Sequence, residues 1–451
     1  MLGTDHTYYP ERLYDGLGRM HYDPLSGDLC LMPPKDMNVK RIAMLSTHGY
    51  FDAEPQLGRT DTGGQVVYVL ELSKALTKQG IEVDIYTRWF DKSKEMIESV
   101  PLFPNLRIIR IPGGPWKFIP KEELYDFLQE LAGNMRDFIQ ENKLEYDLFH
   151  GHYVDAGIVA ILVSKTISKP VYFTAHSLGA WKRQLMNGFS KKMEAKYQFE
   201  KRIEEELKVF QFVNGQTATT KAQLQIMESL YGFQSENTTI IPPGVDIEAF
   251  HPGKVSENSE LPTNYIFCLS RIDENKGHEL LLNAFDIVRR DLPEIHLVIG
   301  GGSPRPKPRE KQLLNRIEKI IDEKGMRDRV HLVGYIPDEK IKSFYRRARV
   351  FVLPSTFEPF GMTALEAMAC GTPAIVSKFA GVSEFLCDHT DSIITDPTDT
   401  EKFASAILEI LKDQKLAVQI GLEGLKTVRK RFSWDAIAEM HLLFYEKLMP
   451  K

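Results

Sequence analysis

Two cations follow a strand-like run in the second half of the chain and could bind an anion. Arg271 and Lys276 lie five residues apart, directly after the apolar run NYIFCLS. Arginine and lysine are rarely buried unless they are paired, so we expect an oxygen-rich anion such as a diphosphate as their partner. At an effective dielectric constant of about 20, each cation would contribute roughly 4 kcal/mol of Coulomb attraction before desolvation. A solvated surface pair is the alternative interpretation.

Two carboxylates lie further along, in the segment EPFGMTALE that follows the run VFVLPS. The pattern predicts a helix that begins near Gly361 and Met362 and presents its free N–H groups and positive dipole end to a ligand. A carboxylate on the loop, Glu358, can bind sugar hydroxyls, and one inside the helix, Glu366, can bind a ribose diol. Taken alone, Glu358 could equally be an ordinary helix-start residue.

The first half of the chain carries a glycine pair, Gly63 and Gly64, between a strand-like run and an apolar helical pattern. Glycines let a ligand approach the backbone closely, and the N-terminus of the following helix favours negative charge. A tight turn without a ligand is equally consistent with this feature. The segment is not G-x-G-x-x-G, so the dinucleotide-binding fingerprint is absent and a Rossmann dehydrogenase is disfavoured.

Histidines and cations follow other strand-like runs of the first half. His152 and His176 each come at the end of such a run, so both are expected at the same edge of a sheet. Lys182 lies just beyond His176, and Lys201 and Arg202 lie in a long amphipathic stretch at 191–208. A lone histidine is usually structural and helical cations are usually solvated, so their own patterns assign none of them a role.

The elements that position these residues alternate between strand-like runs and helical patterns, in two successive series. Such series form doubly wound α/β sheets, whose ligands bind at the carboxyl ends of the strands. A tract rich in proline and glycine, 240–253, separates the series and is predicted to connect two domains. We expect an irregular arm at 1–38, Rossmann-like domains at 39–240 and 241–432 that face a cleft, and a C-terminal helix at 433–451 that packs back on the first domain.

Composition narrows the class of protein. A chain of 451 residues favours two domains over a single core. The formal net charge of −5 argues against nucleic acid or an anionic membrane as a partner, and no run of about eighteen apolar residues predicts a membrane span. Four cysteines without C-x-x-C spacing argue against a zinc site, and together with the lack of a signal-peptide pattern they favour a cytoplasmic protein. The oligomeric state stays open.

With these residues in view, the chain resembles glycosyltransferase family four, in the branch that contains sucrose-phosphate and mannosylfructose-phosphate synthases. The resemblance runs from about Val39 to the C-terminus. It rests on the motifs STHGY, DTGGQVVYVLELSKAL, IPKEEL, HYVDAG, HSLGAWK, the Arg271/Lys276 pair and EPFGMTALEAMACGTPAIV. It implies the GT-B fold, an α/β architecture of two Rossmann-like doubly wound domains. The sequence departs from the pattern at Trp181 and Met362, and both GDP-mannose and UDP-glucose stay open as the donor.

The resemblance also implies roles for individual residues. The catalytic residues would be Arg271 and Lys276, which neutralise the leaving diphosphate, Glu358, which holds the donor sugar, and His176, which offers its backbone carbonyl. The donor-binding residues would be Gly63, Gly64, Phe360, Gly361, Met362, Thr363 and Glu366. The acceptor-binding residues would be Gln65, Lys121, Tyr153, Ser177, Lys182 and Arg202, with Lys182 and Arg202 on the phosphate.

The expected reaction is retaining, metal-independent transfer of glucose or mannose from the nucleotide sugar to fructose 6-phosphate. No cofactor or metal is expected besides the nucleotide-sugar cosubstrate, because no Asp-x-Asp pair follows a strand-like run and the cations and a helix dipole must meet the leaving charge. A different acceptor within the family is one alternative. Two other classes are a sugar-nucleotide epimerase, which would not need acceptor-phosphate residues, and a non-catalytic sugar-nucleotide sensor.

Overall fold

The computed structural model describes residues 38–54, 63–186, 188–232, 236–254, 261–303 and 306–449, with the backbone of 21–22 and 29–30. It divides into two compact units. The first unit comprises the chain up to Ala218, Ile226–Ile241 and Ala438–Lys451, and the second comprises Thr219–Gln225 and Pro242–Ile437. Most of the predicted arm at 1–38 lies outside the described residues, apart from the paired strands β1 (His21–Tyr22) and β2 (Leu29–Cys30).

The first unit is built on an eight-stranded sheet with the order β10-β9-β8-β7-β3-β4-β6-β5. Its strands are β3 (Arg41–Leu45), β4 (Glu82–Trp89), β5 (Ile97–Val100), β6 (Phe103–Pro112), β7 (Leu148–His152), β8 (Val171–Thr174), β9 (Gly215–Ala218) and β10 (Thr238–Ile240). All pairings are parallel except that of β5 with β6. The edge strand β5 was not predicted, because IESV is short and buries only Val100.

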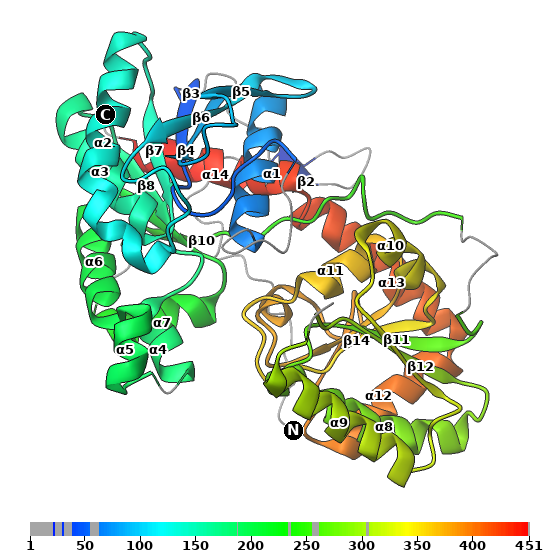
Figure 1. The fold of residues 1–451 in the computed structure, drawn as a ribbon. Helices are drawn as coiled ribbons and strands as arrows, with labels where there is room; N and C mark the ends of the chain where they lie inside the picture. The colour runs from blue at the N-terminus through cyan, green and yellow to red at the C-terminus, as the bar shows by residue number, and fades with distance from the viewer. Residues whose placement is uncertain are drawn as a thin grey trace, which may run out of the picture. The chain divides into compact units, whose positions relative to one another are not determined.

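Helices cover both faces of this sheet. The helices that belong to this unit wholly or in part are α1 (Gly64–Lys78), α2 (Leu128–Glu141), α3 (Val154–Ile167), α4 (Gly179–Leu185), α5 (Lys191–Tyr197), α6 (Phe199–Phe212), α7 (Lys221–Tyr231) and α14 (Trp434–Leu448), with a 3-10 helix at Lys121–Phe127 (Figure 1). The first residues of α7 and of α14 belong to the second unit. The amphipathic stretch 191–208 is two helices rather than one, because Gln198 has φ 45° and separates α5 from α6. None of the helices within the described ranges is both long and apolar enough to cross a membrane.

The second unit has a six-stranded, fully parallel sheet with the order β13-β12-β11-β14-β15-β16. Its strands are β11 (Tyr265–Leu269), β12 (His296–Gly300), β13 (Val330–Gly334), β14 (Val350–Leu353), β15 (Ala374–Ser377) and β16 (Ile393–Thr395). Its helices are α8 (His278–Asp291), α9 (Pro308–Glu323), α10 (Asp338–Arg347), α11 (Met362–Ala369), α12 (Thr400–Lys412) and α13 (Gln414–Arg431).

Both faces of the second sheet are buried, as parallel sheets require. In β11, Ile266 and Cys268 belong to the core shared with α8, α9 and α12, whereas Tyr265, Phe267 and Leu269 belong to the core shared with α10 and α11. Figure 1 shows these two groups of helices on opposite sides of the sheet. The near-continuous apolar run of this strand, rather than an alternating one, follows from burial on both sides.

The strand order fixes where ligands can bind in each unit. In both sheets the first strand, β3 or β11, has the next strand of the chain, β4 or β12, on one side and a later strand, β7 or β14, on the other. The connections that leave these two neighbouring strands therefore run in opposite directions along the sheet, which opens a crevice at the carboxyl ends of the strands. The loops after β3, β7, β11 and β14 are the ones that the crevices expose, and these loops carry most of the predicted site residues.

Helix α14 adds polar contacts to the first unit. The Tyr445 hydroxyl lies 2.6 Å from His150 Nδ1, and Tyr172 donates a hydrogen bond of 3.0 Å to the Tyr445 carbonyl. His441 Nε2 lies 2.9 Å from the Tyr68 hydroxyl of α1. All of these side chains are buried, so the last helix is part of the core of the first unit.

Candidate active site

Lys276 and Glu358 meet at the crevice of the second unit. Lys276 follows β11, Glu358 follows β14, and Lys276 Nζ lies 2.5 Å from Glu358 Oε2. Their side chains are 7% and 16% exposed, so both charges are largely withdrawn from water. The Asn275 side chain donates a hydrogen bond of 2.8 Å to the Phe357 carbonyl and joins the two loops behind the pair. The structure thus brings together two of the predicted catalytic residues.

Gly277 allows the backbone to pass close to β14. It has φ +72°, and a Cβ atom there would lie 2.0 Å from the carbonyl oxygen of Pro354. Only glycine fits this close approach in the left-handed region. Gly277 therefore sets the position of Lys276 immediately before it.

Arg271 differs from Lys276 in its surroundings. It is exposed, and its guanidinium forms no ion pair with any residue in the described ranges. Lys276 is already paired with Glu358, whereas Arg271 can bind a ligand without breaking an existing ion pair. Two such cations are suited to a ligand with more than one negative charge.

Helix α11 starts where the sequence predicted it, with Gly361 as the residue before its first turn. Gly361 has φ +112°, which a residue with a side chain rarely adopts. Phe360 is buried, and Met362 and Thr363 are half-buried in the first turn, where backbone N–H groups have no partner inside the helix. Those N–H groups and the helix dipole make this end of α11 suited to an anion or an electron-rich oxygen.

Glu366, the predicted ribose ligand, lies one turn further into α11. The Tyr345 hydroxyl donates a hydrogen bond of 2.6 Å to its Oε2 atom. Burial raises the pKa of Glu366, and the hydrogen bond from Tyr345 opposes this shift. Tyr345 thus orients the carboxylate while the other oxygen has no hydrogen-bond partner among the described residues.

In the first unit, Arg202 of α6 contacts two other predicted acceptor-binding residues. Its Nη2 atom donates to the Ser177 carbonyl at 2.8 Å and to the Ser177 hydroxyl at 2.9 Å. Its guanidinium lies over the Tyr153 ring at 4.6 Å. Arg202, Ser177 and Tyr153 therefore form one cluster at the carboxyl ends of β7 and β8.

The charge of Arg202 is balanced from behind by Glu206. Arg202 Nε donates to Glu206 Oε1 at 2.8 Å, and both side chains are almost fully buried. Glu206 also accepts the Gly179 N–H at the start of α4 and a hydrogen bond from the Tyr231 hydroxyl. Burial works against the charged form of Arg202, but the charge of Glu206 outweighs it and raises the pKa of the guanidinium. The predicted phosphate binder is thus a permanently charged group held in one orientation.

The other predicted acceptor-binding residues, Gln65, Lys121 and Lys182, lie on separate helices and make contacts outside this cluster. Gln65 Nε2 donates to Ser46 Oγ and to the His152 carbonyl, both at 3.1 Å, and bridges the ends of β3 and β7. Lys182 Nζ lies over the Tyr197 ring at 5.1 Å. Lys121 Nζ lies 3.8 Å from Glu122 Oε1. Gly63 and Gly64 mark the start of α1, where a Cβ atom would meet nothing within 4 Å.

Two strand-end residues of the first unit have strained backbones. Tyr153 has φ 76° and ψ 162°, and His176 has φ 55°. Side chains other than glycine rarely adopt positive φ, and such strain persists where the surroundings enforce it, often at functional sites. The Tyr153 N–H bonds to the Thr174 carbonyl at 2.9 Å, which ties the strained residue after β7 to β8.

The two histidines predicted at this sheet edge contact each other. His152 Nδ1 lies 2.9 Å from His176 Nε2, and His152 is fully buried. Burial lowers the pKa of His176 to about 3 and that of His152 well below its ordinary value. Both rings are therefore neutral at physiological pH, so neither supplies a cation for an anionic ligand.

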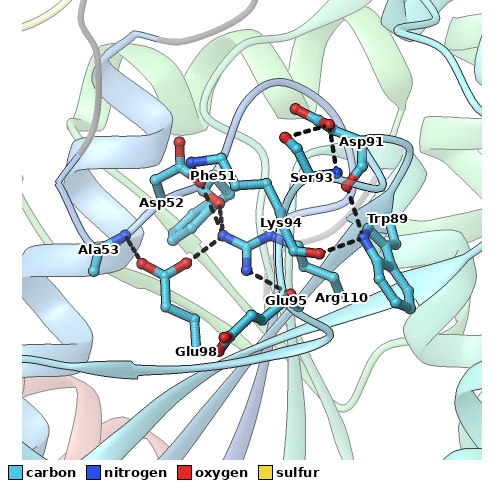
Figure 2. A network of polar contacts seen from close by, with 10 residues as sticks. All are labelled: Phe51, Asp52, Ala53, Trp89, Asp91, Ser93, Lys94, Glu95, Glu98 and Arg110. Carbon is cyan, nitrogen blue, oxygen red and sulfur yellow. Dashed lines mark hydrogen bonds and ion pairs between the residues drawn. The ribbon is translucent and has the colours of Figure 1, made fainter.

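A polar network around Arg110 anchors the loop that follows β3 (Figure 2). Arg110, on β6, donates to the Phe51 carbonyl and to Asp52 Oδ1, both at 2.9 Å, and also bonds Glu98 of β5. Asp52 also forms an ion pair with Lys94, whose Nζ atom lies 3.0 Å from Asp52 Oδ1. Arg110 is buried, so the network fixes residues 51–53 to the β5–β6 edge. Strand β5, which the sequence did not predict, thus helps to hold the loop after β3 in place.

Sequence reasoning assigned no role to three buried residues beside the first-unit cluster, Glu206, His48 and Asp155. Glu206 was hidden because an i, i+4 pair with Arg202 has the pattern of a solvated helix surface. His48, in the quoted motif STHGY, and Asp155, in HYVDAG, were not assigned roles. In the structure His48 Nδ1 lies 2.9 Å from Asp155 Oδ1 and 3.0 Å from Oδ2. The position of both residues directly after strand-like runs was the signal that could have found them.

Comparison with known proteins agrees with this geometry. Residues 62–249 match the model of "Glycosyltransferase Family 4", and residues 254–427 match that of "Glycosyl transferases group 1". A mannosylfructose-phosphate synthase from Agrobacterium fabrum is 36% identical over 416 residues, which cover 90% of this chain and 91% of the relative. The chain belongs to glycosyltransferase family 4.

Other members of the family are similar over nearly their full lengths. A D-inositol 3-phosphate glycosyltransferase from Corynebacterium jeikeium is 30% identical and covers 91% of this chain and 97% of the relative. The structure of a sucrose-phosphate synthase from Thermosynechococcus elongatus superimposes with a TM-score of 0.70 at 29% identity, and the match covers 91% of this chain and 99% of the other. The predicted GT-B fold, with two Rossmann-like units, and the predicted glycosyltransferase activity are thereby confirmed.

Proposed function

We propose that this glycosyltransferase moves a glucosyl or mannosyl group from UDP-glucose or GDP-mannose to fructose 6-phosphate, with retention of anomeric configuration and without a metal. The sugar nucleotide binds at the strand ends of the second unit and the sugar phosphate at those of the first. The similarity to relatives named mannosylfructose-phosphate synthase and probable sucrose-phosphate synthase supports this substrate class.

The observation that carries the acceptor assignment is the cluster of Arg202, Ser177 and Tyr153. A phosphate dianion needs charge-assisted donors. Arg202 is buried and fixed by Glu206, yet its Nη1 atom has no hydrogen-bond partner among the described residues. The Tyr153 hydroxyl likewise has no partner within the described ranges, although the residue is almost fully buried. These two donors and the Ser177 hydroxyl supply a preformed set for phosphate oxygens.

The donor assignment rests on Arg271, Lys276 and Glu358. The acceptor hydroxyl attacks the anomeric carbon on the face from which the diphosphate departs, the bond between that carbon and the phosphate oxygen breaks, and the hydroxyl proton passes to the departing oxygen. Arg271, Lys276 and the N-terminus of α11 meet the charge that develops there, and donors of this kind act most strongly in the transition state. Glu358 holds the sugar hydroxyls, and Glu366 holds the ribose.

A product assay tests this proposal directly. Fructose 6-phosphate is incubated with GDP-mannose, UDP-glucose or ADP-glucose, each with a chelator present. Release of a nucleoside diphosphate together with a phosphorylated disaccharide, from one donor, is the expected result. Turnover that requires added divalent metal contradicts the metal-independent mechanism, and no product with any donor contradicts the acceptor. Conversion of a sugar nucleotide without acceptor would instead indicate an epimerase.

A further inference from the structure

His48 and Asp155 form a buried pair at the crevice of the first unit. His48 lies in the loop after β3, and Asp155 lies in the first turn of α3 after β7, so the pair bridges the two strands between which the chain direction reverses. His48 is 7% exposed and Asp155 is 1% exposed. Thr47 also donates its hydroxyl hydrogen to Asp155 Oδ2. Neither residue has a part in the donor or acceptor contacts described above.

Asp155 determines which nitrogen of His48 carries a proton in the neutral ring. Burial opposes the ionised form of Asp155, but its contacts with His48 and Thr47 outweigh this effect and lower the pKa of the carboxyl. An ionised carboxylate can only accept, so His48 Nδ1 must be the donor across the 2.9 Å contact. In the neutral imidazole the lone pair then lies on Nε2.

His48 Nε2 is available to a polar ligand. It forms no hydrogen bond with any described residue, and it is not among the sealed polar atoms that lack a partner. His48 and Arg202 both contact the Tyr153 ring: the His48 centroid lies 4.8 Å from the ring centroid in a T-shaped arrangement, and the Arg202 guanidinium lies 4.6 Å from it. His48 therefore borders the cluster that we assign to the acceptor phosphate.

We propose that His48 Nε2 accepts a hydrogen bond from a hydroxyl of the acceptor sugar, with Asp155 as the residue that positions the ring and fixes its tautomer. This inference rests on the proposed acceptor. A sugar phosphate has donors only at its hydroxyls, so an acceptor nitrogen beside a phosphate-binding cluster distinguishes the sugar ring from its phosphate.

Two substitutions separate the role of Nε2 from that of Nδ1. In His48→Asn the amide nitrogen replaces Nδ1 and can still donate to Asp155, but nothing replaces Nε2. In His48→Gln the carboxamide reaches the place of Nε2 and can offer an oxygen there. His389→Asn is the matched control, because His389 lies in the second unit with its side chain 51% exposed. Thermal melting of each full-length variant checks that it folds.

Calorimetric titration with fructose 6-phosphate and with inorganic phosphate provides the test. We expect His48→Asn to weaken fructose 6-phosphate binding roughly three- to tenfold, the effect of one lost hydrogen bond, and to leave phosphate binding unchanged. His48→Gln should recover part of the loss, and His389→Asn should match the wild type. Equal weakening for both probes would assign His48 to the phosphate and overturn the inference, as would no weakening.

The tautomer is a second, independent readout. In protein labelled with nitrogen-15 at histidine, the resonances that disappear in His48→Asn belong to His48. Their shifts should show a protonated Nδ1 and an unprotonated Nε2, and the reverse assignment would overturn the role of Asp155. Failure of the proposed function can be distinguished from failure of this inference. If the proposed acceptor is wrong, the wild type itself binds no fructose 6-phosphate, and the inference is then contradicted as well.

Discussion

Lys276 Nζ lies 2.5 Å from Glu358 Oε2, although the two residues are 82 positions apart in the chain. The contact joins the ends of β11 and β14, so the crevice of the second unit holds a balanced pair of charges. A lysine in this state keeps its position without a ligand. When a diphosphate binds, the ammonium can share its hydrogens between the carboxylate and the phosphate oxygens.

Loss of this ammonium should reduce turnover more than stability. We expect Lys276→Ala to lower kcat by about 100-fold or more, because a fixed cation at a developing negative charge contributes on this scale. Lys378→Ala removes a half-exposed lysine that pairs with Asp396 and is the control. Steady-state kinetics with the active donor and acceptor, beside circular dichroism melts, give the comparison. A Lys276→Ala enzyme with wild-type kcat would contradict the role of Lys276.

Replacement of Arg202 should destabilise the first unit as well as weaken acceptor binding. Arg202→Met leaves Glu206 as a buried carboxylate without its cation, and removal of one partner of such a pair costs about 3–5 kcal/mol. The pair of Arg136 and Asp137, whose side chains are 39% and 52% exposed, provides the control, since Arg136→Met should change the free energy of unfolding by less than about 1 kcal/mol. Urea denaturation measures both values. Similar effects of the two substitutions would mean that burial of the Arg202 pair is not maintained in solution.

Acid should weaken the fold through the buried histidines. The pKa values of His176 and His441 are lowered to about 3, chiefly by burial, whereas an unfolded histidine titrates at about 6.5. The unfolded chain therefore binds more protons between these values, and the free energy of unfolding falls as the pH drops below about 6.5. Each such histidine should account for about 2 kcal/mol between pH 6.5 and pH 5.

Substitution of His441 measures how much this one histidine contributes to the pH dependence of stability. His441→Gln should flatten the dependence of unfolding free energy on pH in this range. His389→Gln should not flatten it, because the pKa of His389 is raised, the charge of Asp388 outweighing the effect of partial burial. That residue adds a little stability at low pH, and its contribution disappears as the pH rises through its folded pKa. An unchanged slope in His441→Gln would show that His441 is not buried and neutral.

Gly277→Ala should displace Lys276 by steric conflict. Gly277 and Gly325 have similar positive φ values, +72° and +60°, but a Cβ atom at Gly325 would meet nothing within 4 Å. Backbone strain alone, roughly 1–3 kcal/mol, should appear in Gly325→Ala. Gly277→Ala should lose more stability than that and also lose activity. Equal melting temperatures and equal kcat for the two variants would contradict a close approach of Gly277 to Pro354.

Much of the fold could be predicted from periodicity and from glycine and proline placement. The start of α11 is a clear example, because EPFG interrupts an apolar run and the observed helix begins at Met362. Strand β5 could not be found in this way. Its four residues have little strand character, and it forms because β6 offers an unpaired edge and Arg110 bonds Glu98. Pairing with the next strand of the hairpin, rather than local propensity, determines that element.

The sequence could predict that the site residues lie at strand ends, but not which of their side chains contact one another. Parallel strands place their carboxyl ends together, so Arg271, Lys276, Glu358, His152 and His176 could be expected at strand ends. Which side chains pair there depends on burial and on register between strands, neither of which the chain displays locally. The 107 positions between His48 and Asp155 illustrate this, since no pattern within either segment refers to the other.

Helix α14 gives the protein a particular order of assembly. Its residues from Ala438 onward belong to the first unit, whose other segments end at Ile241, and the bulk of the second unit lies between these points. At roughly 5–20 residues per second, a ribosome needs on the order of ten to forty seconds to cross that interval. Throughout that time His150 and Tyr68 lack their partners Tyr445 and His441. The nascent first unit therefore has an incomplete core until helix α14 has been synthesised.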